Sequence, residues 1–349
     1  MKILTVIGAR PQFIKAAAVS NKLRKNHEEV LVHTGQHYDN NMSDIFFDEL
    51  GIPKPNYNLN IGSGNHGYQT GKMLMELESL YLNEKPDLVL VYGDTNSTLA
   101  GALAASKLLI PVAHIEAGLR SFNMKMPEEQ NRVLTDHISK YLFAPTDTAI
   151  KNLKNENITE NVFNTGDVMF DAIKLFKEKA LETSTVLIDN NISPNEYILS
   201  TIHRAENTND INRLKNIINA LNECEKNIVL PLHPRTHKFI KDYGLTINDN
   251  IKIIAPVGYL DMINLENNSQ KIVTDSGGVQ KEAYFLQKPC ITMRDETEWI
   301  ETVENGWNTI VGSNKEKILD AIINFNPKGE QKMVFGHGNA ADIISEKLK

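Results

Sequence analysis

The chain has 349 residues and a formal net charge of -7, with 41% hydrophobic and 23% charged residues. At about 150 residues per domain this length predicts two domains, and the ordinary composition excludes long disordered segments. The acidic balance, without a long run of lysines or arginines, argues against a nucleic-acid-binding protein. A few local donors can still bind a diphosphate, whatever the total charge.

The two cysteines have no metal-type spacing. Cys224 falls in a helical pattern and Cys290 in an apolar strand run. Buried free thiols in a reducing compartment explain them better than a disulfide. Arg10 and Gln12 interrupt the apolar start too early for a signal peptide, and no apolar stretch approaches the roughly 20 residues of a membrane span. We therefore expect a cytoplasmic protein.

The first half of the chain alternates short apolar runs with amphipathic segments, which is the pattern of parallel βαβ units. Apolar residues between the runs recur at helical spacing, as Ile14, Ala17, Ala18 and Leu23 do. Strands are predicted at residues 2–7, 29–33, 87–92, 111–115, 141–144 and 162–165.

A second series follows a helical pattern at 167–181 and a polar stretch at 182–193. Its strands are predicted at residues 197–202, 227–232, 251–255, 271–274, 289–293 and 308–311. Such continuous apolar strands indicate parallel sheets covered by helices on both faces. The sequence therefore predicts the α/β class, with two Rossmann-like, doubly wound parallel-sheet domains facing across a cleft. We place the first domain at 1–167 and the second at 168–337, and the helical pattern within 338–349 is a candidate to rejoin the first domain.

Polar residues follow most of these strands, and ligands of open α/β sheets bind beyond the carboxyl ends of the strands. In the second half, Ser276, Gly277 and Gly278 follow a strand and open a helix, whose N-terminus attracts phosphate. Glu282, one turn further on, can accept hydrogen bonds from the hydroxyls of a ribose. A plain tight turn with an exposed glutamate explains the same residues, so this motif does not decide by itself.

Charged residues stand beyond several strands of the first half. Arg10 and Lys15 flank a segment that lacks the GxGxxG dinucleotide fingerprint, and they can donate to a diphosphate. The alternative is a solvated Arg10 beside a proline at the first helical position. Asp94 is either a catalytic carboxylate or the N-cap of the next helix. Glu116 ends an apolar strand, where an unpaired carboxylate is costly to bury and where burial would suit it to acid–base chemistry.

Five further residues are ambiguous. Glu128 and Glu129 are candidate catalytic acids, but first-turn acids that complement a helix dipole look the same. His203 follows the first strand of the second series, and it can titrate near neutral pH, bind an anion or be structural. His33 and His37 straddle a turn without a cysteine or carboxylate partner, so we predict no metal site.

The combination of segments resembles the non-hydrolysing UDP-N-acetylglucosamine (UDP-GlcNAc) 2-epimerase family. Each segment is modest alone, but together they stand in the family's order and cover most of the chain. The segments are Gly8-Ala9-Arg10-Pro11-Gln12-Phe13-Ile14-Lys15, Tyr92-Gly93-Asp94-Thr95, His114-Ile115-Glu116-Ala117-Gly118-Leu119-Arg120, Pro127-Glu128-Glu129-Gln130-Asn131-Arg132, His203-Arg204, Thr274-Asp275-Ser276-Gly277-Gly278 and Met293-Arg294-Asp295-Glu296-Thr297-Glu298.

The resemblance implies a GT-B fold that holds UDP mainly in the second domain and the sugar in the first. The family's reaction removes the C2 proton, expels UDP to give a 2-acetamidoglucal, and reverses both steps on the opposite face, so no cofactor is implied. By position, Asp94, Glu116 and Glu128 are the candidate acid–base carboxylates, and His203 assists departure of the diphosphate.

The resemblance also implies a UDP-sugar as the bound partner, a homodimer, and a second, activating substrate site that includes Gln36 and His37. The substrate-binding residues that it implies are Arg10, Lys15, Arg132, His233, Arg235, Ser276, Gly277, Gly278, Glu282, Arg294 and Glu298.

Two segments depart from the common family pattern. Many members have Gly-Thr-Arg-Pro-Glu in place of residues 8–12, and Gln-His-Arg where this chain has Gln36-His37-Tyr38. The form of residues 8–15 also resembles relatives that epimerise UDP-2,3-diacetamido-2,3-dideoxyglucuronate. We therefore expect conversion of UDP-GlcNAc to UDP-ManNAc, with that uronate as the nearest alternative. A GT-B glycosyltransferase, a hydrolysing epimerase and a non-catalytic sugar-nucleotide sensor are further alternatives.

Overall fold

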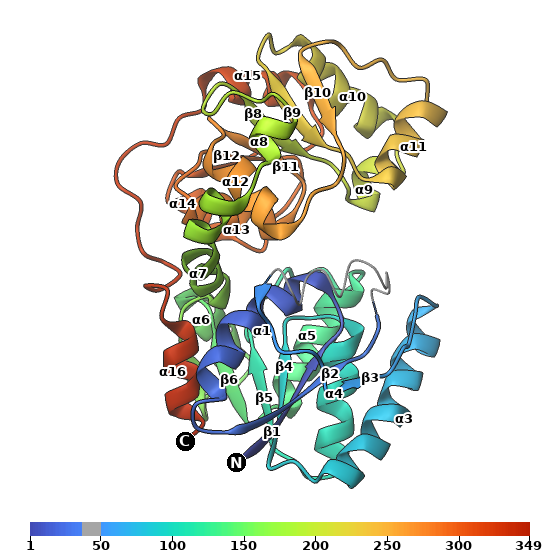
Figure 1. Ribbon diagram of the computed structural model, residues 1–349, viewed down its shortest axis with the longest axis vertical. Coiled ribbons are helices and arrows are strands. Elements are labelled where there is room, and N and C mark those ends of the chain that lie inside the picture. Colours follow the sequence, from blue (N-terminus) through green and yellow to red (C-terminus); the bar gives the residue numbers. More distant parts are fainter. Residues whose placement is uncertain (37–49) are drawn as a thin grey trace. The chain divides into compact units, whose positions relative to one another are not determined.

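The computed structural model describes residues 1–36 and 50–349 (Figure 1). The chain forms two compact units: unit 1 comprises Met1–Leu175 with Met333–Lys349, and unit 2 comprises Phe176–Lys332. The boundaries predicted from the sequence were after residue 167 and after residue 337. Within the described residues, no helix is both long enough and apolar enough to cross a membrane.

Unit 1 is built on a seven-stranded parallel sheet with the order β3-β2-β1-β4-β5-β6-β7. Its strands are β1 (Lys2–Ile7), β2 (Glu28–His33), β3 (Tyr57–Asn58), β4 (Leu88–Tyr92), β5 (Val112–Ile115), β6 (Tyr141–Ala144) and β7 (Val162–Asn164). All six predicted strands are present, and only the two-residue β3 was missed. The strand order reverses between β1 and β4, and such a switch point leaves room for a ligand beyond the strand ends.

Helices cover both faces of this sheet. They are α1 (Arg10–Leu23), α3 (His66–Glu84), α4 (Asn96–Lys107), α5 (Pro127–Ile138), α6 (Asp147–Asn155), the first part of α7 (Val168–Thr183) and α16 (Ala340–Lys347). Right-handed crossovers in opposite directions from the switch point place α1 and α4 on opposite faces. Leu4 and Val6 of β1 pack with Met73 and Leu77 of α3 in one core, and α16 lies against α1 (Figure 1).

Unit 2 has a six-stranded parallel sheet with the order β10-β9-β8-β11-β12-β13. Its strands are β8 (Ile198–Thr201), β9 (Ile228–Pro231), β10 (Ile251–Ile254), β11 (Ile272–Thr274), β12 (Cys290–Thr292) and β13 (Asn308–Ile310). Its helices are the last part of α7, α8 (Val186–Asp189), α9 (Ala205–Thr208), α10 (Ile211–Glu223), α11 (Pro234–Asp242), α12 (Tyr259–Asn267), α13 (Gly277–Phe285), α14 (Ile300–Glu304) and α15 (Lys315–Asn324). Each predicted strand of the second series is present, so both units have the predicted Rossmann-like architecture.

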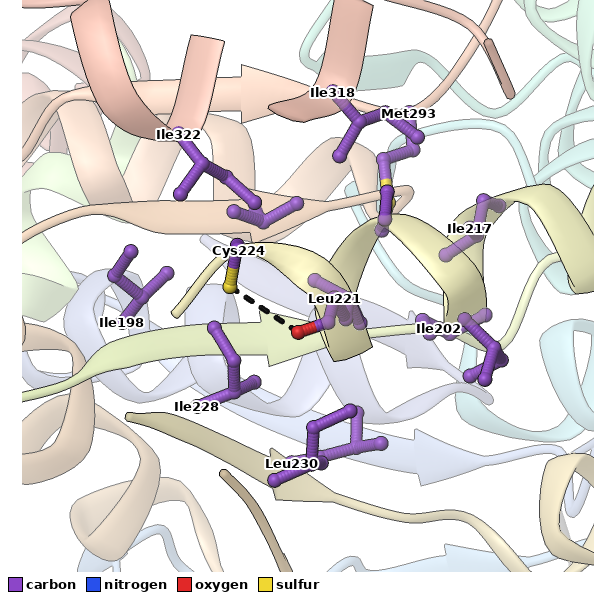
Figure 2. Packing of buried hydrophobic residues seen from close by; sticks show 14 of the residues in the cluster. Ile198, Ile202, Ile217, Leu221, Cys224, Ile228, Leu230, Met293, Ile318 and Ile322 are labelled. Atoms are coloured by element: carbon purple, nitrogen blue, oxygen red, sulfur yellow. Dashed lines mark hydrogen bonds between the residues drawn. The ribbon is translucent and has the colours of Figure 1, made fainter. Parts of the chain in front are cut away.

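The sheet of unit 2 separates two hydrophobic cores. Along β9, Ile228 and Leu230 face the core formed with α10 and α15, whereas Val229 faces the core formed with α12 and α13. Figure 2 shows the first core, in which the Cys224 thiol donates to the carbonyl oxygen of Leu221. Both cysteines, Cys224 and Cys290, are buried and free. This alternation on a parallel sheet is why its strands read as continuous apolar runs.

The C-terminal segment contacts α7 and the loop between β7 and α7. The carboxylate of Asp171 in α7 accepts hydrogen bonds from the backbone N–H groups of Ala340 and Ala341 at 3.0 and 2.9 Å, and thereby caps α16. Burial raises the pKa of Asp171. Gly166 and Gly336, both with positive φ, approach so closely that a Cβ atom on Gly336 would lie 2.9 Å from the Gly166 Cα. Glycine is required here because any side chain would separate the two segments.

Candidate active site

The loops after β1 and β4 adjoin at the switch point of unit 1, and Gln12 joins them. Its side-chain oxygen accepts hydrogen bonds from the backbone of Gly8 and Ala9 at 2.8 and 3.1 Å. Its amide nitrogen donates to the carbonyl oxygen of Tyr92 at 2.7 Å and to the hydroxyl of Thr98 at 3.0 Å. Because Gln12 presents an acceptor to the loop after β1 and a donor to the loop after β4, it holds the two loops together at the switch point.

Glu116 lies at the end of β5, with its side chain buried against a cation. Its backbone has the unusual φ of 71°, and its side chain forms an ion pair with Lys15, which is also buried. Gly93 leaves space beside this pair, since a Cβ atom there would lie 3.1 Å from Glu116 Oε2. The sequence suggested Lys15 as a donor to a diphosphate or an anionic intermediate, and the structure adds Glu116 as its partner.

Asp94 follows Gly93 at the end of β4 and pairs with Arg132 of α5. The side-chain amide of Asn131 donates to the Asp94 carbonyl oxygen at 2.9 Å. The alternative of an N-cap role for Asp94 is wrong, because Thr95 caps α4 and accepts from the backbone of Thr98 at 3.3 Å. About a third of the Asp94 side chain, 30%, stays exposed, so the carboxylate is held but accessible.

The adjacent glutamates of α5 have different surroundings. Glu129 is 1% exposed, pairs with Arg132 at 2.7 Å, and accepts from the backbone of Ser121 and Phe122. Glu128 is exposed in the first turn of α5. Glu129 therefore stabilises the loop before α5, whereas the catalytic assignment of Glu128 stays a prediction.

A largely buried network of charged residues joins β5 to α5. Asp136 of α5 accepts from His114 of β5 and from Arg120, and Arg120 also pairs with Glu156. Burial alone would raise the pKa of Asp136, but its hydrogen bond and charge interactions with His114 and Arg120 are stronger and lower it. Burial likewise opposes the charge of Arg120, yet Glu156 and Asp136 raise its pKa. The sequence indicated two of these four residues, His114 and Arg120, which lie in a signature segment. It gave no signal for Asp136 or Glu156.

In unit 2 the completely buried Asp275 organises the loop after β8. Its carboxylate accepts from the backbone N–H groups of His203 and Arg204 at 3.1 and 3.0 Å and from the Asn207 amide at 3.1 Å. The His203 ring lies 3.4 Å from the same carboxylate, with 49% of its side chain exposed. The pKa of His203 is lowered, chiefly because surrounding protein atoms displace water from the ring. The charge of Asp275 acts to raise this pKa, whereas interactions with Arg204 and His233 act to lower it.

The N-terminus of α13 is the position at which the sequence predicts a phosphate site. Ser276 caps the helix by accepting from the Val279 N–H at 3.4 Å, and Gly278 is exposed beside it. A Cβ atom on Gly277 would lie 2.5 Å from Glu298 Oε1, so glycine is needed for Glu298 to approach. Free N–H groups and the helix dipole at such an end attract an anion. The alternative of an exposed Glu282 is wrong, because Glu282 is buried, 6% exposed.

The other predicted contact residues of unit 2 follow β9 and β12. Arg294 is buried and pairs with Glu298 at 2.8 Å. His233 caps α11, where the exposed Arg235 donates to Asn209 at 2.9 Å. His233 follows β9, which pairs with β8, the strand that precedes His203.

The remaining predictions concern the first two βα loops. Arg10 is half-buried and opens α1, with a proline in its first turn as expected. The Gln36 side-chain oxygen accepts from the backbone and hydroxyl of Ser97 at 3.0 and 2.7 Å, which ties the loop after β2 to α4. His37 lies outside the described residues. Within the described residues no group of three or more His, Cys, Asp or Glu side chains could hold a metal ion.

Two Rossmann-like units, each with charged or polar side chains beyond the carboxyl ends of its strands, define a two-domain α/β protein of the GT-B type. The family model described as UDP-N-acetylglucosamine 2-epimerase matches residues 21–349. The chain therefore belongs to the UDP-N-acetylglucosamine 2-epimerase family, and it is an isomerase.

Three relatives illustrate how closely this family is matched. A UDP-N-acetylglucosamine 2-epimerase homolog from Methanococcus maripaludis is 61% identical over 358 residues, covering 100% of this chain and 99% of the relative. The UDP-2,3-diacetamido-2,3-dideoxy-D-glucuronate 2-epimerase of Pseudomonas aeruginosa is 54% identical, with the same coverage. The crystal structure of Methanocaldococcus jannaschii UDP-GlcNAc 2-epimerase in complex with UDP-GlcNAc and UDP has a TM-score of 0.92 and 51% identity, covering 100% of this chain and 99% of that one.

Proposed function

We propose that the protein interconverts UDP-GlcNAc and UDP-ManNAc by reversible, non-hydrolytic epimerisation at C2. The observation that carries this proposal is the pair Asp94 and Glu116 at the ends of the adjoining strands β4 and β5. Each carboxylate is held beside a cation, Arg132 or Lys15. Inverting a carbon by proton transfer requires positioned acid–base groups, and this edge of unit 1 supplies them.

The proposed reaction begins with elimination. A carboxylate accepts the C2 proton, the electrons of that C–H bond form the C1=C2 double bond of a 2-acetamidoglucal, and the C1–O bond breaks to release UDP. The diphosphate then adds back to C1 while an acid returns a proton to the opposite face of C2. Asp94, Glu116 and Glu128 are the candidates for these proton transfers, and no redox cofactor enters the balance.

Unit 2 is proposed to bind the UDP moiety. The N-terminus of α13, with Ser276, Gly277 and Gly278, would receive a phosphate, and Glu282 would accept from the ribose. His203 would stabilise the departing diphosphate, since charge develops there as the C1–O bond breaks. Further proposed substrate contacts are Arg10, Lys15, Arg132, His233, Arg235, Arg294 and Glu298.

Proton NMR of the purified enzyme with UDP-GlcNAc in D2O tests the proposal. We expect deuterium at C2 and a growing UDP-ManNAc signal with little free sugar. Asp94→Asn and Glu116→Gln should each abolish the exchange, whereas Glu160→Gln, at an exposed position of the same unit, should retain it. Free ManNAc would instead indicate a hydrolysing epimerase.

A second candidate substrate is UDP-2,3-diacetamido-2,3-dideoxyglucuronate. The observation that favours it is the 54% identical relative from Pseudomonas aeruginosa that is named for this sugar. The same NMR experiment with this uronate decides between the two, because exchange at C2 of the uronate alone would exclude UDP-GlcNAc as the substrate. Lack of exchange with both sugars would favour a glycosyltransferase or a sensor.

We further propose a homodimer, following the family resemblance. On α3, the side chains of Tyr68, Met75 and Leu82 are 63%, 62% and 58% exposed and recur every seven residues, which aligns them on one face of the helix. An exposed apolar stripe of this kind suits association with a second copy. Met75→Glu should shift the protein toward monomers in sedimentation analysis, and Glu160→Lys, at an exposed position outside α3, serves as the charge-changing control.

The cytoplasm is the proposed location. The two thiols, Cys224 and Cys290, are buried and form no disulfide, as suits a reducing compartment. Fractionation of cells that express a tagged chain would test this.

A further inference from the structure

His114 is a completely buried histidine whose two ring nitrogens both contact oxygen atoms. Its Nε2 lies 2.7 Å from the carbonyl oxygen of Gly93, and its Nδ1 lies 2.7 Å from Oδ1 of Asp136. His114 thus connects the turn that carries Asp94 to helix α5. The elimination mechanism assigns it no role.

The hydrogen-bond partners fix the number of protons on the ring. A backbone carbonyl oxygen only accepts, so Nε2 must carry a proton. Asp136 also acts as an acceptor, since its other oxygen accepts from the backbone of Gly118 at 3.0 Å and from Arg120 at 2.7 Å. An ionised Asp136 has no proton to give, and therefore Nδ1 must carry one as well.

The charges of the network are compatible with this answer. Asp136 and Glu156, the latter with 27% of its side chain exposed, supply two negative charges. Arg120 and a doubly protonated His114 supply two positive charges, so the four residues together are neutral.

We propose that His114 is held permanently as an imidazolium and acts as a positioning residue for the acid–base carboxylates. By donating to the Gly93 carbonyl, it fixes the left-handed Gly93, φ 62°, and so the direction in which Asp94 leaves β4. The same turn leaves the space next to Glu116 Oε2 open. The effect on rate rests on the proposed function, but the protonation state of His114 does not.

Two-bond proton–nitrogen NMR of the full-length, 15N-histidine-labelled enzyme tests the protonation state. The His114 signal is assigned by its loss in His114→Gln. We expect both ring nitrogens to have the shifts of protonated nitrogens at about pH 7 and at about pH 8, where an ordinary histidine is neutral. An unprotonated ring nitrogen on His114 at about pH 7 would overturn the proposal.

Asp136→Asn tests the positioning role while preserving the shape of the side chain. Without the charge of Asp136, the ring should lose one proton, and kcat for C2 exchange should fall by about tenfold or more while KM changes by less than about twofold. Asp136→Glu should recover part of kcat, and Glu160→Gln, at an exposed position of the same unit, should leave it unchanged. Full kcat in a folded Asp136→Asn variant would refute the positioning role. If neither sugar turns over even in the unaltered enzyme, the proposed function fails, and the NMR result still decides the protonation state.

Discussion

Replacement of Asp275 should show how much one buried carboxylate contributes to the order of unit 2. Asp275→Ala removes the acceptor of three donors, the backbone N–H groups of His203 and Arg204 and the side-chain amide of Asn207. A buried donor left unpaired costs about 1–3 kcal/mol, and water entering the vacated space offsets part of this. We therefore expect Asp275→Ala to lower the free energy of unfolding by about 3–5 kcal/mol. Asp275→Asn keeps one acceptor oxygen and should cost about 1–2 kcal/mol.

Urea titration followed by tryptophan fluorescence is the suitable assay, because both tryptophans, Trp299 and Trp307, belong to unit 2. Asp249→Ala, at an exposed loop position of the same unit, is the control and should change the free energy by less than about 0.5 kcal/mol. If Asp275→Ala costs less than about 1 kcal/mol, the three donors do not depend on this carboxylate and the reasoning is wrong.

Asp275→Asn should also change the titration of His203, the histidine proposed to assist departure of the diphosphate. The charge of Asp275 opposes the lowering of the His203 pKa, so its removal in Asp275→Asn should lower that pKa further. If protonated His203 assists departure of the diphosphate, activity is lost as pH rises through its pKa. The basic limb of the kcat profile should then move to lower pH in Asp275→Asn, and a shift to higher pH would contradict the assigned electrostatics.

Three further predictions concern unit 1. Gly93→Ala places a Cβ in a left-handed conformation, 3.1 Å from Glu116, and should cost about 1–2 kcal/mol of stability and lower C2 exchange in the NMR assay. Arg120→Met leaves buried Asp136 without one counter-ion and should cost about 3–5 kcal/mol in urea unfolding monitored by circular dichroism. The pKa of His27 is lowered in the folded protein by burial and by nearby positive charges. In the unfolded chain the His27 pKa is about 6.5, so the unfolded chain binds the proton at a higher pH than the folded protein does. Stability is therefore lost as the pH falls below about 6.5. His27→Gln should therefore lose less stability than the unaltered protein between about pH 7.5 and pH 5.5, and an equal loss would rule out His27 as the source.

Much of the fold could be predicted because the central parallel strands, such as β1, β4, β5 and β8, are buried on both faces. Continuous apolar runs such as 87–92 indicate strands directly, and polar residues after them, such as Asp94 and Glu116, necessarily lie at the same edge of the sheet. The two-residue β3 carries no such run, and it could not be found this way.

The roles of adjacent residues could not be predicted, because they depend on the rotation of a helix about its axis. The buried face of α5 is polar, and it includes Glu129, Arg132 and Asp136. A polar buried face gives no hydrophobic periodicity, so nothing in the sequence says that Glu129 is enclosed while Glu128 is exposed. For the same reason the choice between Asp94 and Thr95 as the cap of α4 depended on the backbone, since both residue types cap helices.

The close contact between Gly166 and Gly336, both in unit 1, has a consequence for the connectivity of the chain. Unit 2 is an insertion into unit 1, and the chain passes between the units twice. Both the N-terminal ammonium and Lys349 act on His27, and Figure 1 shows both chain ends at the same end of unit 1. A circular permutant with these ends joined and a new start at Met333 would therefore encode unit 1 and then unit 2 as two uninterrupted stretches. Such a chain would retain a single covalent crossing, inside α7.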